Sequence, residues 1–348
     1  MWLRMEGGIE LIPGSPRFVF LFLDGVGLNP HPHANPFAGA NCRYLPFHSP
    51  SPRLPDGTPI AAVDALMGVE GIPQSASGQS TLYTGINIPA RWGHRGSYPG
   101  TDIRRILYRD NLLKSLSVCG RKAVFLNAYP HYAHLFSPPH LELRADGEWR
   151  FSDEFPAQFR RRLSTTTCMM LSNGMLPFNE EDIRLGKALY QDFSNASLIR
   201  LGLDVPEYSP EQAAEILAAN AALADFVLFE FFQTDLFAHR HEFSECVDLV
   251  ARLDRFLGHL LDSMDPEQDT LLLTSDHGNL EDCSTRIHTR NPVPLLAWGK
   301  NGDVLRSRIR DLGDVTPAIR DLMNCPAGGG TARLQERDPD APPQKEVS

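Results

Sequence analysis

Three uninterrupted apolar runs, each ending in an aspartate, constrain the fold of this chain more than any other feature of its sequence. They are FVFLFLD (18–24), FVLFEFFQTD (226–235) and TLLLTSD (270–276). Runs without polar alternation are typical of strands that are buried on both faces, as in a parallel sheet. A fourth apolar run, VPLLAWG (293–299), follows shortly after His288. The chain is therefore expected to contain a parallel sheet.

Helical periodicity separates these runs. Between the second and third runs, apolar residues recur at helical spacing, namely at Leu249, Leu253, Phe256, Leu260 and Met264. A strand, a helix and a strand in this order form a βαβ crossover. Further helices are expected over about 210–225 and 111–118, the latter just before the short strand KAVFLNA. We therefore predict an α/β protein with a doubly wound, mostly parallel sheet.

The domain organisation follows from where this pattern is interrupted. Residues 131–208 mix aromatic, proline and arginine residues without clear strands ending in aspartate. We interpret them as a small inserted cap or lid, which leaves a discontinuous core of residues 1–130 and 209–325. The tail, residues 326–348, is rich in glycine, proline and charge and is expected to be disordered.

The composition is that of a soluble globular protein large enough to bury a core. Of the 348 residues, 42% are apolar and 22% are charged, which are typical values for globular chains. The net charge is −10, from 33 basic and 43 acidic residues, and this balance argues against a general nucleic-acid-binding protein. The arginine clusters at 104–105 and 160–162 are candidates for local anion sites.

Cysteine usage and the distribution of apolar residues indicate the compartment. Six cysteines are scattered without a C-x-x-C pair, which is typical of free thiols in a reducing compartment. The N-terminal stretch MWLRMEGGIELIPG lacks a sustained apolar segment, and no run approaches the roughly 18 apolar residues of a membrane span. We therefore expect a cytoplasmic protein that does not cross a membrane, and the sequence carries no prediction of its oligomeric state.

The aspartates that end the three runs point to a cation site. In parallel α/β sheets, ligands bind beyond the carboxyl ends of the strands. Asp24, Asp235 and Asp276 all stand at such ends and would converge on one rim of the sheet. Carboxylates brought this close repel one another unless a cation neutralises them. A single aspartate in such a position is as readily a helix cap, so the argument depends on the whole set.

Three histidines accompany these aspartates along the chain: His239, His277 and His288. The first lies four residues after Asp235, a D-x-x-x-H spacing that places both side chains on one face of a helical turn. This register favours His239 over His241 as a ligand. Six oxygen and nitrogen ligands are too many for one tetrahedral zinc ion and suit two divalent ions, Zn²⁺ or Mn²⁺.

A candidate nucleophile lies in the segment GIPQSASGQSTLYTGIN (71–87). A Pro-Gln turn is followed by small residues that can start a helix at Ser75. A serine at a helix N-terminus beside two cations has surroundings that favour its alkoxide, as phosphoryl transfer requires. The competing hydroxyls of Ser77 and Thr81 lie further into the helix. Taken alone, the serines of this segment are equally well explained as caps and packing residues.

Together these motifs resemble the metalloenzyme branch of the alkaline phosphatase superfamily, which includes cofactor-independent phosphoglycerate mutase and phosphopentomutase. The matching pieces stand in the family's order and are LDGVG, QSASGQ, TDLFAH, SDHGN and HTRNPVP. The resemblance implies an alkaline-phosphatase-like core. This chain departs from the family at Gln79, where the family often has histidine, and its predicted cap is shorter than that of a phosphoglycerate mutase.

The resemblance also implies ligand sets and a reaction. One metal would be held by Asp24, Ser75, Asp276 and His277, and the other by Asp235, His239 and His288. Ser75 falls where the family keeps its phosphorylated serine or threonine. The implied activity is that of a dinuclear, metal-dependent phosphomutase or phosphatase. It would act on a small phosphorylated metabolite through a phosphoserine intermediate.

Cationic side chains for the anionic end of a substrate are sought in the segment ARWGHRGSYPGTDIRR. The candidates are Arg91, His94, Arg95 and Arg105. Two other hydrolase classes fit less well. The stretch SPSPR lacks the central proline of a sulfatase maturation motif, and Ser75 is not in the G-x-S-x-G elbow of a serine esterase.

The alternative from another functional class is a non-catalytic, metal-stabilised binding protein of the same fold. Such a protein would have no evident need to keep Ser75.

Overall fold

The computed structural model describes residues 17–145 and 147–325, so the predicted disordered tail and the N-terminal stretch lie outside the described residues. Its centre is a six-stranded sheet in the order β2-β8-β7-β1-β6-β3. The strands are β2 (Ile60–Val63), β8 (Val293–Gly299), β7 (Asp269–Thr274), β1 (Arg17–Leu23), β6 (Phe226–Phe231) and β3 (Ala123–Phe125). β7, β1, β6 and β3 run parallel to one another. At one edge of the sheet, β8 pairs antiparallel with β7, and β2 pairs antiparallel with β8. The predicted α/β fold with a mostly parallel sheet is confirmed.

The three apolar runs that end in aspartate form the middle of this sheet. β1 pairs in parallel with β6 on one side and with β7 on the other, placing Phe18 beside both Phe226 and Thr270. All residues of β6 and β7 are buried. The sheet is covered on both faces, which explains why polar alternation is missing from these strands.

Side chains of β1 alternate between two hydrophobic clusters, one on each face of the sheet. Phe18, Phe20 and Phe22 belong to the first cluster, and Val19, Leu21 and Leu23 belong to the second. This period of two is the geometry of an extended strand. The central strand therefore joins both halves of the core.

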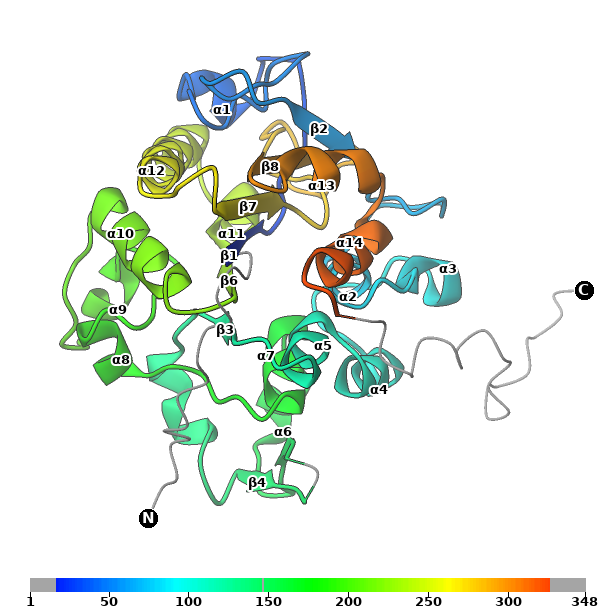
Figure 1. Ribbon diagram of the computed structural model, residues 1–348, viewed down its shortest axis with the longest axis vertical. Coiled ribbons are helices and arrows are strands. Elements are labelled where there is room, and N and C mark those ends of the chain that lie inside the picture. Colours follow the sequence, from blue (N-terminus) through cyan, green and yellow to red (C-terminus); the bar gives the residue numbers. More distant parts are fainter. Residues whose placement is uncertain (1–16, 146, 326–348) are drawn as a thin grey trace, which may run out of the picture.

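Helices cover each cluster. The first receives α2 (Ser75–Thr84), α3 (Ile88–Trp92), α4 (Thr101–Arg109), α5 (Leu112–Val118), α7 (Thr165–Ser172), α13 (Gly302–Arg308) and α14 (Val315–Leu322). The second receives α1 (Pro36–Gly39), α10 (Pro210–Ala221), α11 (Gln233–Arg240) and α12 (Phe243–Asp262). In Figure 1, α10 and α12 lie on one side of the column of strands, and α2, α5 and α14 lie on the other.

The longest of these helices, α12, shows why apolar residues at helical spacing predicted a helix correctly. α12 is the predicted crossover between β6 and β7, and a capping box of Glu242 and Glu245 defines its start. Its apolar residues at helical spacing are buried in the second cluster. The helices expected over 210–225 and 111–118 are α10 and α5, which end or begin within a few residues of the expected bounds.

The predicted cap range, residues 131–208, contains several short elements. After η1 (Pro130–Leu135) come β4 (Leu141–Leu143), β5 (Trp149–Phe151), α6 (Ala157–Arg160), α7, α8 (Glu180–Arg184) and α9 (Ala196–Arg200). Outside this range, the short helix η2 (Leu312–Asp314) directly precedes α14. β4 and β5 form a small antiparallel sheet. Strands of three residues are too short to show periodicity, so no sequence pattern predicted them. The division into core and cap stays a prediction.

Parts of this range pack into the two clusters beside the sheet. Cys168 and Leu171 of α7 belong to the first cluster. Phe193 belongs to the second, where its ring stacks on Phe231 at 5.3 Å and on Phe256 at 4.9 Å between centroids. These contacts tie the range to the sheet.

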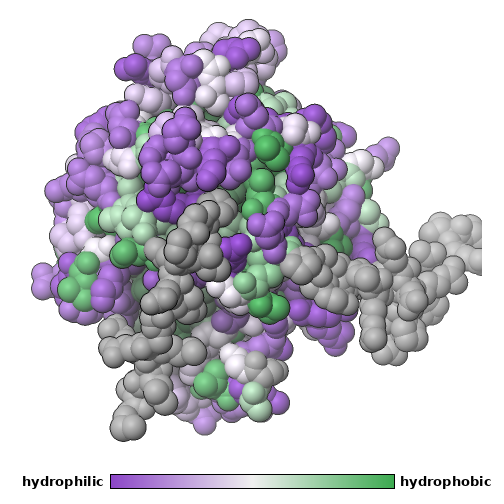
Figure 2. Space-filling model, in the orientation of Figure 1, coloured by the Kyte–Doolittle hydropathy of each residue, from purple (hydrophilic) through white to green (hydrophobic). Residues whose placement is uncertain are grey.

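Surface properties agree with a folded chain that keeps its apolar residues inside. Figure 2 shows mainly hydrophilic residues on the visible face, with hydrophobic ones in small separate groups. Among residues 17–145 and 147–325, every helix lacks the length or the apolar character needed to cross a membrane. All six cysteines are free thiols.

The aromatic stack around Phe193 generates a stability prediction. Phe193→Ala removes a ring that is only 2% exposed, so the free energy of unfolding should fall by about 3–5 kcal/mol. Leu201→Ala, in the same range but at a side chain that is 64% exposed, should change it by less than about 0.5 kcal/mol. Urea unfolding of the three full-length chains measures both. Equal losses in the two variants would contradict the proposed anchoring role of Phe193.

Candidate metal centre

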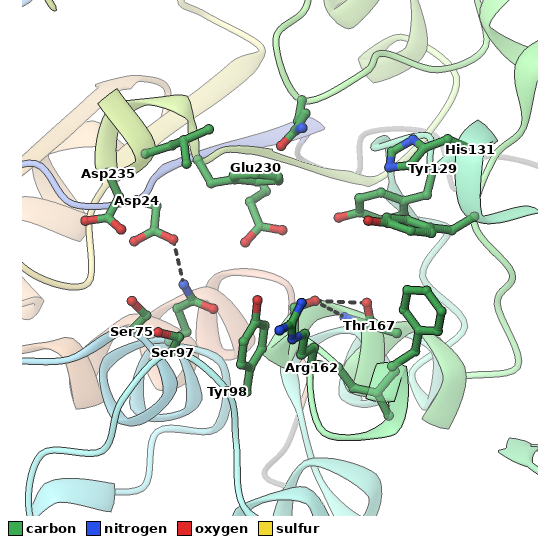
Figure 3. Close-up of a pocket in the computed structure, with 18 of the residues that line it drawn as sticks. Asp24, Ser75, Ser97, Tyr98, Tyr129, His131, Arg162, Thr167, Glu230 and Asp235 are labelled. Carbon is green, nitrogen blue, oxygen red and sulfur yellow. Dashed lines mark hydrogen bonds between the residues drawn. The ribbon is translucent and has the colours of Figure 1, made fainter. Parts of the chain in front are cut away.

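The sheet brings all seven predicted metal and nucleophile residues to one rim. Asp24 follows β1, Asp276 and His277 follow β7, and the remaining residues come from the neighbouring elements. Because β1, β6 and β7 are parallel and adjacent, their carboxyl ends meet at the same edge. Figure 3 shows Asp24, Asp235 and Ser75 converging at one side of a cavity.

One group of ligands centres on His277. Its Nε2 lies 3.2 Å from Asp24 Oδ1 and 3.6 Å from Asp276 Oδ2. The same nitrogen lies 3.0 Å from Ser75 Oγ. All four side chains are buried. Asp24, Asp276 and His277 offer ligand atoms that lie close enough together to hold one metal ion.

A second group centres on Asp235. Its two carboxylate oxygens lie 3.4 Å from His239 Nε2 and 3.5 Å from His288 Nε2, and these two nitrogens are 3.1 Å apart. The His288 ring also stacks on that of His277, with centroids 3.7 Å apart and an interplanar angle of 13°. The two groups are therefore in direct contact. Asp235, His277 and His288 form a further set with metal-binding geometry.

Backbone carbonyls orient all three imidazole rings through the other ring nitrogen. Nδ1 of His239 lies 2.8 Å from the oxygen of Arg286, and Nδ1 of His288 lies 2.9 Å from that of Pro73. His277 Nδ1 lies 3.3 Å from the oxygen of Gly278. An Nδ1–H that donates to a carbonyl leaves Nε2 as the ligand atom, which is the usual arrangement in metal sites.

The neighbouring His241 is turned away from the centre. Its ring stacks on Phe237 with centroids 3.9 Å apart, and its Nδ1 lies 3.2 Å from Glu245 Oε1. The D-x-x-x-H register thus brings His239, and not His241, to Asp235.

Unsatisfied oxygens show that these residues fit divalent cations. Asp24 Oδ1 and Asp276 Oδ2 are buried and accept no hydrogen bond from any described residue. Burial and the charge of Asp276 raise the pKa of Asp24 well above its ordinary value. Buried carboxylates in this condition need a proton or a cation. Carboxylate oxygens and imidazole nitrogens are the donors that Zn²⁺ and Mn²⁺ accept.

In the protein alone, a proton on His277 balances this charge. Burial lowers the pKa of His277, but the charges of Asp276 and Asp24 outweigh burial and raise it to about 10. Burial and the charge of His277 lower the pKa of His288 to about 4. One imidazolium thus stands among the carboxylates, and metal binding at this cluster would release its proton.

Ser75 is the first residue of α2, as predicted, but the helix start is not a free anion site. The backbone N–H groups of Ala76 and Ser77 donate to the carbonyls of Gly96 and Arg95, at 2.9 and 3.3 Å. These donors are therefore unavailable to an anion. Negative charge at Ser75 would instead be balanced by protonated His277 or, once metal binding has displaced that proton, by the bound cation.

The packing of α2 against the end of β7 fixes where Ser75 stands. A Cβ added to Gly78 would lie 2.7 Å from the carbonyl oxygen of Asp276, so a larger residue would push the helix away. One residue later, Gln79 Nε2 donates to Asp24 Oδ2 at 3.1 Å. Gln79, the position that departs from the family pattern, thus holds a metal-ligand candidate in place.

A buried carboxylate that the sequence analysis missed joins the loops around the centre. Glu281 accepts hydrogen bonds from the backbone N–H groups of Gly27 and Asn279, both at 2.8 Å. It also accepts from Asn291 Nδ2 at 3.0 Å and from the Thr289 hydroxyl. Asn279 in turn donates to Asp235 Oδ1 at 2.7 Å. In a polar loop, a glutamate gives no sign in the sequence that it is buried.

The metal centre opens into a cavity of about 810 Å³. Asp24, Ser75, Asp235, His239 and His288 line one side of it. The rest of its lining combines polar residues with an aromatic group that includes Tyr98, Tyr129, Tyr132, Phe136, Phe155 and Phe159. Arg162 and Arg240 are the arginines among its described lining residues.

The four predicted substrate-binding residues are not among this lining, as far as the described residues go. Arg105 is paired with Asp102 at 3.2 Å, and its side chain is 76% exposed. His94 Nε2 lies 3.2 Å from the oxygen of Val69. The Arg91 guanidinium lies over the Trp92 ring, 6.0 Å from its centroid. Arg95 is exposed and makes backbone contacts with Ser77.

Glu230 is a second cavity residue that the sequence analysis missed. It belongs to the buried strand β6, and its Oε2 accepts a hydrogen bond of 2.8 Å from Thr166 Oγ1. Burial raises its pKa to about 8. The sequence feature that could have identified this residue is its position as the one acidic residue inside the otherwise apolar run FVLFEFF.

Part of this chain is similar to a known protein family. Residues 205–327 match the Metalloenzyme superfamily family model. The resemblance to this superfamily is confirmed. The matched part of the chain contains Asp235, His239, Asp276, His277 and His288. Asp24 and Ser75 lie outside it.

Curated relatives include enzymes named 2,3-bisphosphoglycerate-independent phosphoglycerate mutase. That of Desulforudis audaxviator (strain MP104C) is 31% identical over 127 residues, covering 35% of this chain and 25% of the relative. That of Pyrococcus horikoshii (strain ATCC 700860 / DSM 12428 / JCM 9974 / NBRC 100139 / OT-3) is 32% identical over 148 residues, covering 36% and 35%. This chain thus matches only about a third or less of the length of these relatives.

A solved structure extends the similarity in fold to most of the chain. The alkaline phosphatase from the Antarctic bacterium TAB5 superposes with a TM-score of 0.51 at 11% sequence identity, covering 90% of this chain and 99% of that one. At this identity the similarity concerns the fold alone. This chain therefore has an alkaline-phosphatase-like fold.

The buried Glu230 predicts a pH effect on stability. Between its ordinary pKa of 4.5 and its folded pKa of about 8, the folded protein keeps a proton that the unfolded chain has released. The free energy of unfolding therefore falls as pH rises through this window. Glu230→Gln stays neutral, so from pH 5 to pH 9 the wild type should lose about 2–4 kcal/mol relative to this variant. Urea unfolding of chelator-treated chains tests this, and parallel pH profiles would refute it.

Proposed function

We propose that this protein is a divalent-metal-dependent phosphoryl-transfer enzyme that acts on a small phosphorylated metabolite through a phosphoserine intermediate. The observation that carries this proposal is the position of Ser75. Its hydroxyl lies 3.0 Å from His277 Nε2, inside the cluster of carboxylates and imidazoles, and lines the cavity. The similarity to relatives named as phosphoglycerate mutases supports the same class of reaction.

Two sets of side chains would hold the cations. Asp24, Asp276, His277 and Ser75 would bind one ion, and Asp235, His239 and His288 would bind the other. Bound divalent ions supply positive charge that lowers the pKa of a serine hydroxyl and stabilises charge on phosphate oxygens. The residues of the chain fix the hydroxyl, orient the imidazoles and line the site for the phosphate.

Ser75 fits the role of nucleophile better than its neighbours do. The Ser77 hydroxyl donates to the oxygen of Gln74 at 3.1 Å and accepts from the N–H of Arg95 at 3.0 Å. The Thr81 hydroxyl donates to the oxygen of Ser77 at 2.8 Å and accepts from the N–H of Ile88 at 3.2 Å. Both hydroxyls therefore serve the packing of α2. Among the three, Ser75 is the one that lines the cavity.

The opposite wall suggests how a substrate is held. Its aromatic side chains suit the carbon-rich part of a phosphorylated metabolite, and Arg162 suits a second anionic group. Tyr132, Phe155 and Arg162 come from residues 131–208, the range predicted as a cap. A wall that excludes water favours return of the phosphoryl group to substrate, and an open one favours hydrolysis. Phosphorus NMR of the products distinguishes a mutase from a phosphatase.

Removal of the nucleophile is the sharpest test. Ser75→Ala should lower phosphoryl transfer by several orders of magnitude while keeping the fold and most metal affinity, because the stronger ligands remain. Asp276→Asn should lose metal and activity together, and Ser77→Ala serves as the matched control that keeps its nucleophile. Activity is followed with a panel of phosphomonoesters, and a phosphopeptide trapped from the wild type locates the phosphate. Full activity of Ser75→Ala, or phosphate on Ser77 or Thr81, would refute the assignment.

Metal removal tests the centre as a whole. The chain should bind about two divalent ions per molecule, and chelation should abolish turnover because the carboxylates then lack their counter-charge. Mn²⁺ or Zn²⁺ should restore it. Metal content is measured by elemental analysis beside the activity assay. Turnover that survives exhaustive chelation would contradict the proposal, and two bound ions without any transferase activity would favour the metal-stabilised binding protein instead.

A further inference from the structure

A second, smaller cavity of about 280 Å³ gathers four arginines from three separate elements. Arg104 and Arg105 come from α4, Arg150 from β5 and Arg160 from α6. The metal-ligand candidates do not line this cavity, and among the described lining residues only Leu163 is shared with the larger one. The sequence clusters at 104–105 and 160–162, candidates for anion sites, thus meet in space.

Carboxylates offset only part of this positive charge. Arg105 pairs with Asp102 at 3.2 Å, on the surface. Arg150 pairs with Glu148, which also binds Lys114. Each of these carboxylates carries one negative charge, and the second is divided between two cations. The four guanidinium groups therefore leave the cavity with excess positive charge.

The other two guanidinium groups are held by neutral acceptors. Arg104 donates to the carbonyl oxygens of Pro99 and Arg160, both at 2.7 Å. Arg160 donates to the carbonyl oxygen of Ser152. Carbonyl oxygens hold a guanidinium in place without cancelling its charge. The hydrogen bond from Arg104 to the carbonyl oxygen of Arg160 also links α4 to α6.

Aromatic packing fixes a further cation. The Arg150 guanidinium lies over the Tyr108 ring, 3.8 Å from its centroid. This cation–π contact orients the guanidinium group. Arg104 and Arg150 line the cavity together with the buried thiol of Cys168. Burial raises the pKa of Cys168 to about 12, and the charges of both arginines oppose this rise. Contacts within the fold thus orient Arg104, Arg150 and Arg160, whereas Arg105 lies on the surface.

We infer that this cavity binds a small phosphate-type oxyanion at a site separate from the metal centre. Guanidinium groups match the oxygens of phosphate in pairs, and groups already held in place lose little entropy on binding. The phosphate can be free or part of a small organic ester. The aromatic rings of Tyr108 and Phe151 beside the arginines provide contacts for the organic part of an ester.

Calorimetric titration of the metal-loaded, full-length protein with inorganic phosphate tests this inference. Two binding events are expected in the wild type. Asp276→Asn, which disables the metal centre, should keep one of them. In the Asp276→Asn protein, adding Arg104→Gln should weaken the remaining binding of phosphate by about tenfold or more, as loss of a charge-assisted contact does. Titration with glycerol phosphate shows the source, since tighter binding than inorganic phosphate indicates an ester and equal binding indicates phosphate alone.

Matched variants separate binding from folding. Arg105→Gln changes an exposed lining residue that the fold tolerates, and it should also weaken the remaining event. Arg109→Gln, on the same helix but outside the cavity, should change it by no more than about twofold. Thermal melts of each variant check the fold. If Asp276→Asn abolishes all phosphate binding, or if neither Arg104→Gln nor Arg105→Gln weakens it, the inference is wrong, whatever the outcome for Ser75.

Discussion

Repulsion among buried carboxylates at the rim of the sheet is the constraint on which the rest of this structure depends. Asp24 and Asp276 are buried, with an oxygen of each left without a hydrogen bond from any described residue. Such an arrangement persists only where positive charge is supplied, by a proton on His277 or by a cation. The surrounding fold makes this unfavourable grouping possible because it fixes every backbone segment involved.

That support comes from the loops and helices that meet at the rim. Glu281 ties together the backbone at Gly27 and Asn279. Gly78 lets α2 approach the carbonyl of Asp276. Three backbone carbonyls aim the imidazoles. The result is a preorganised set of ligands, in which little reorganisation is needed when a cation binds.

The central strands and the candidate ligands were predictable from the sequence because each depends on local pattern. Continuous apolar runs marked β1, β6 and β7, and residues at their ends were expected to share a rim. Features set by long-range packing were not predictable. From the sequence alone, Glu281 resembles a solvent-exposed loop residue. The antiparallel pairing of β2 with β8 joins residues that are 230 or more positions apart in the chain, such as Ile60 with Leu296 and Val63 with Val293. The cationic residues predicted to bind substrate, Arg91, His94, Arg95 and Arg105, are not among the described residues that line the cavity.

The cavity has two walls of different origin, and this has an evolutionary consequence. One wall consists of ligands at the rim of the sheet, where buried charge and close packing leave few substitutions tolerable. The other consists largely of side chains such as Tyr132 and Phe159, whose rings can be exchanged without disturbing a ligand. In the proposed enzyme, selection could therefore act on substrate preference in one wall while the candidate metal centre stays unchanged. A lineage with this architecture could diversify what it recognises and retain how it reacts.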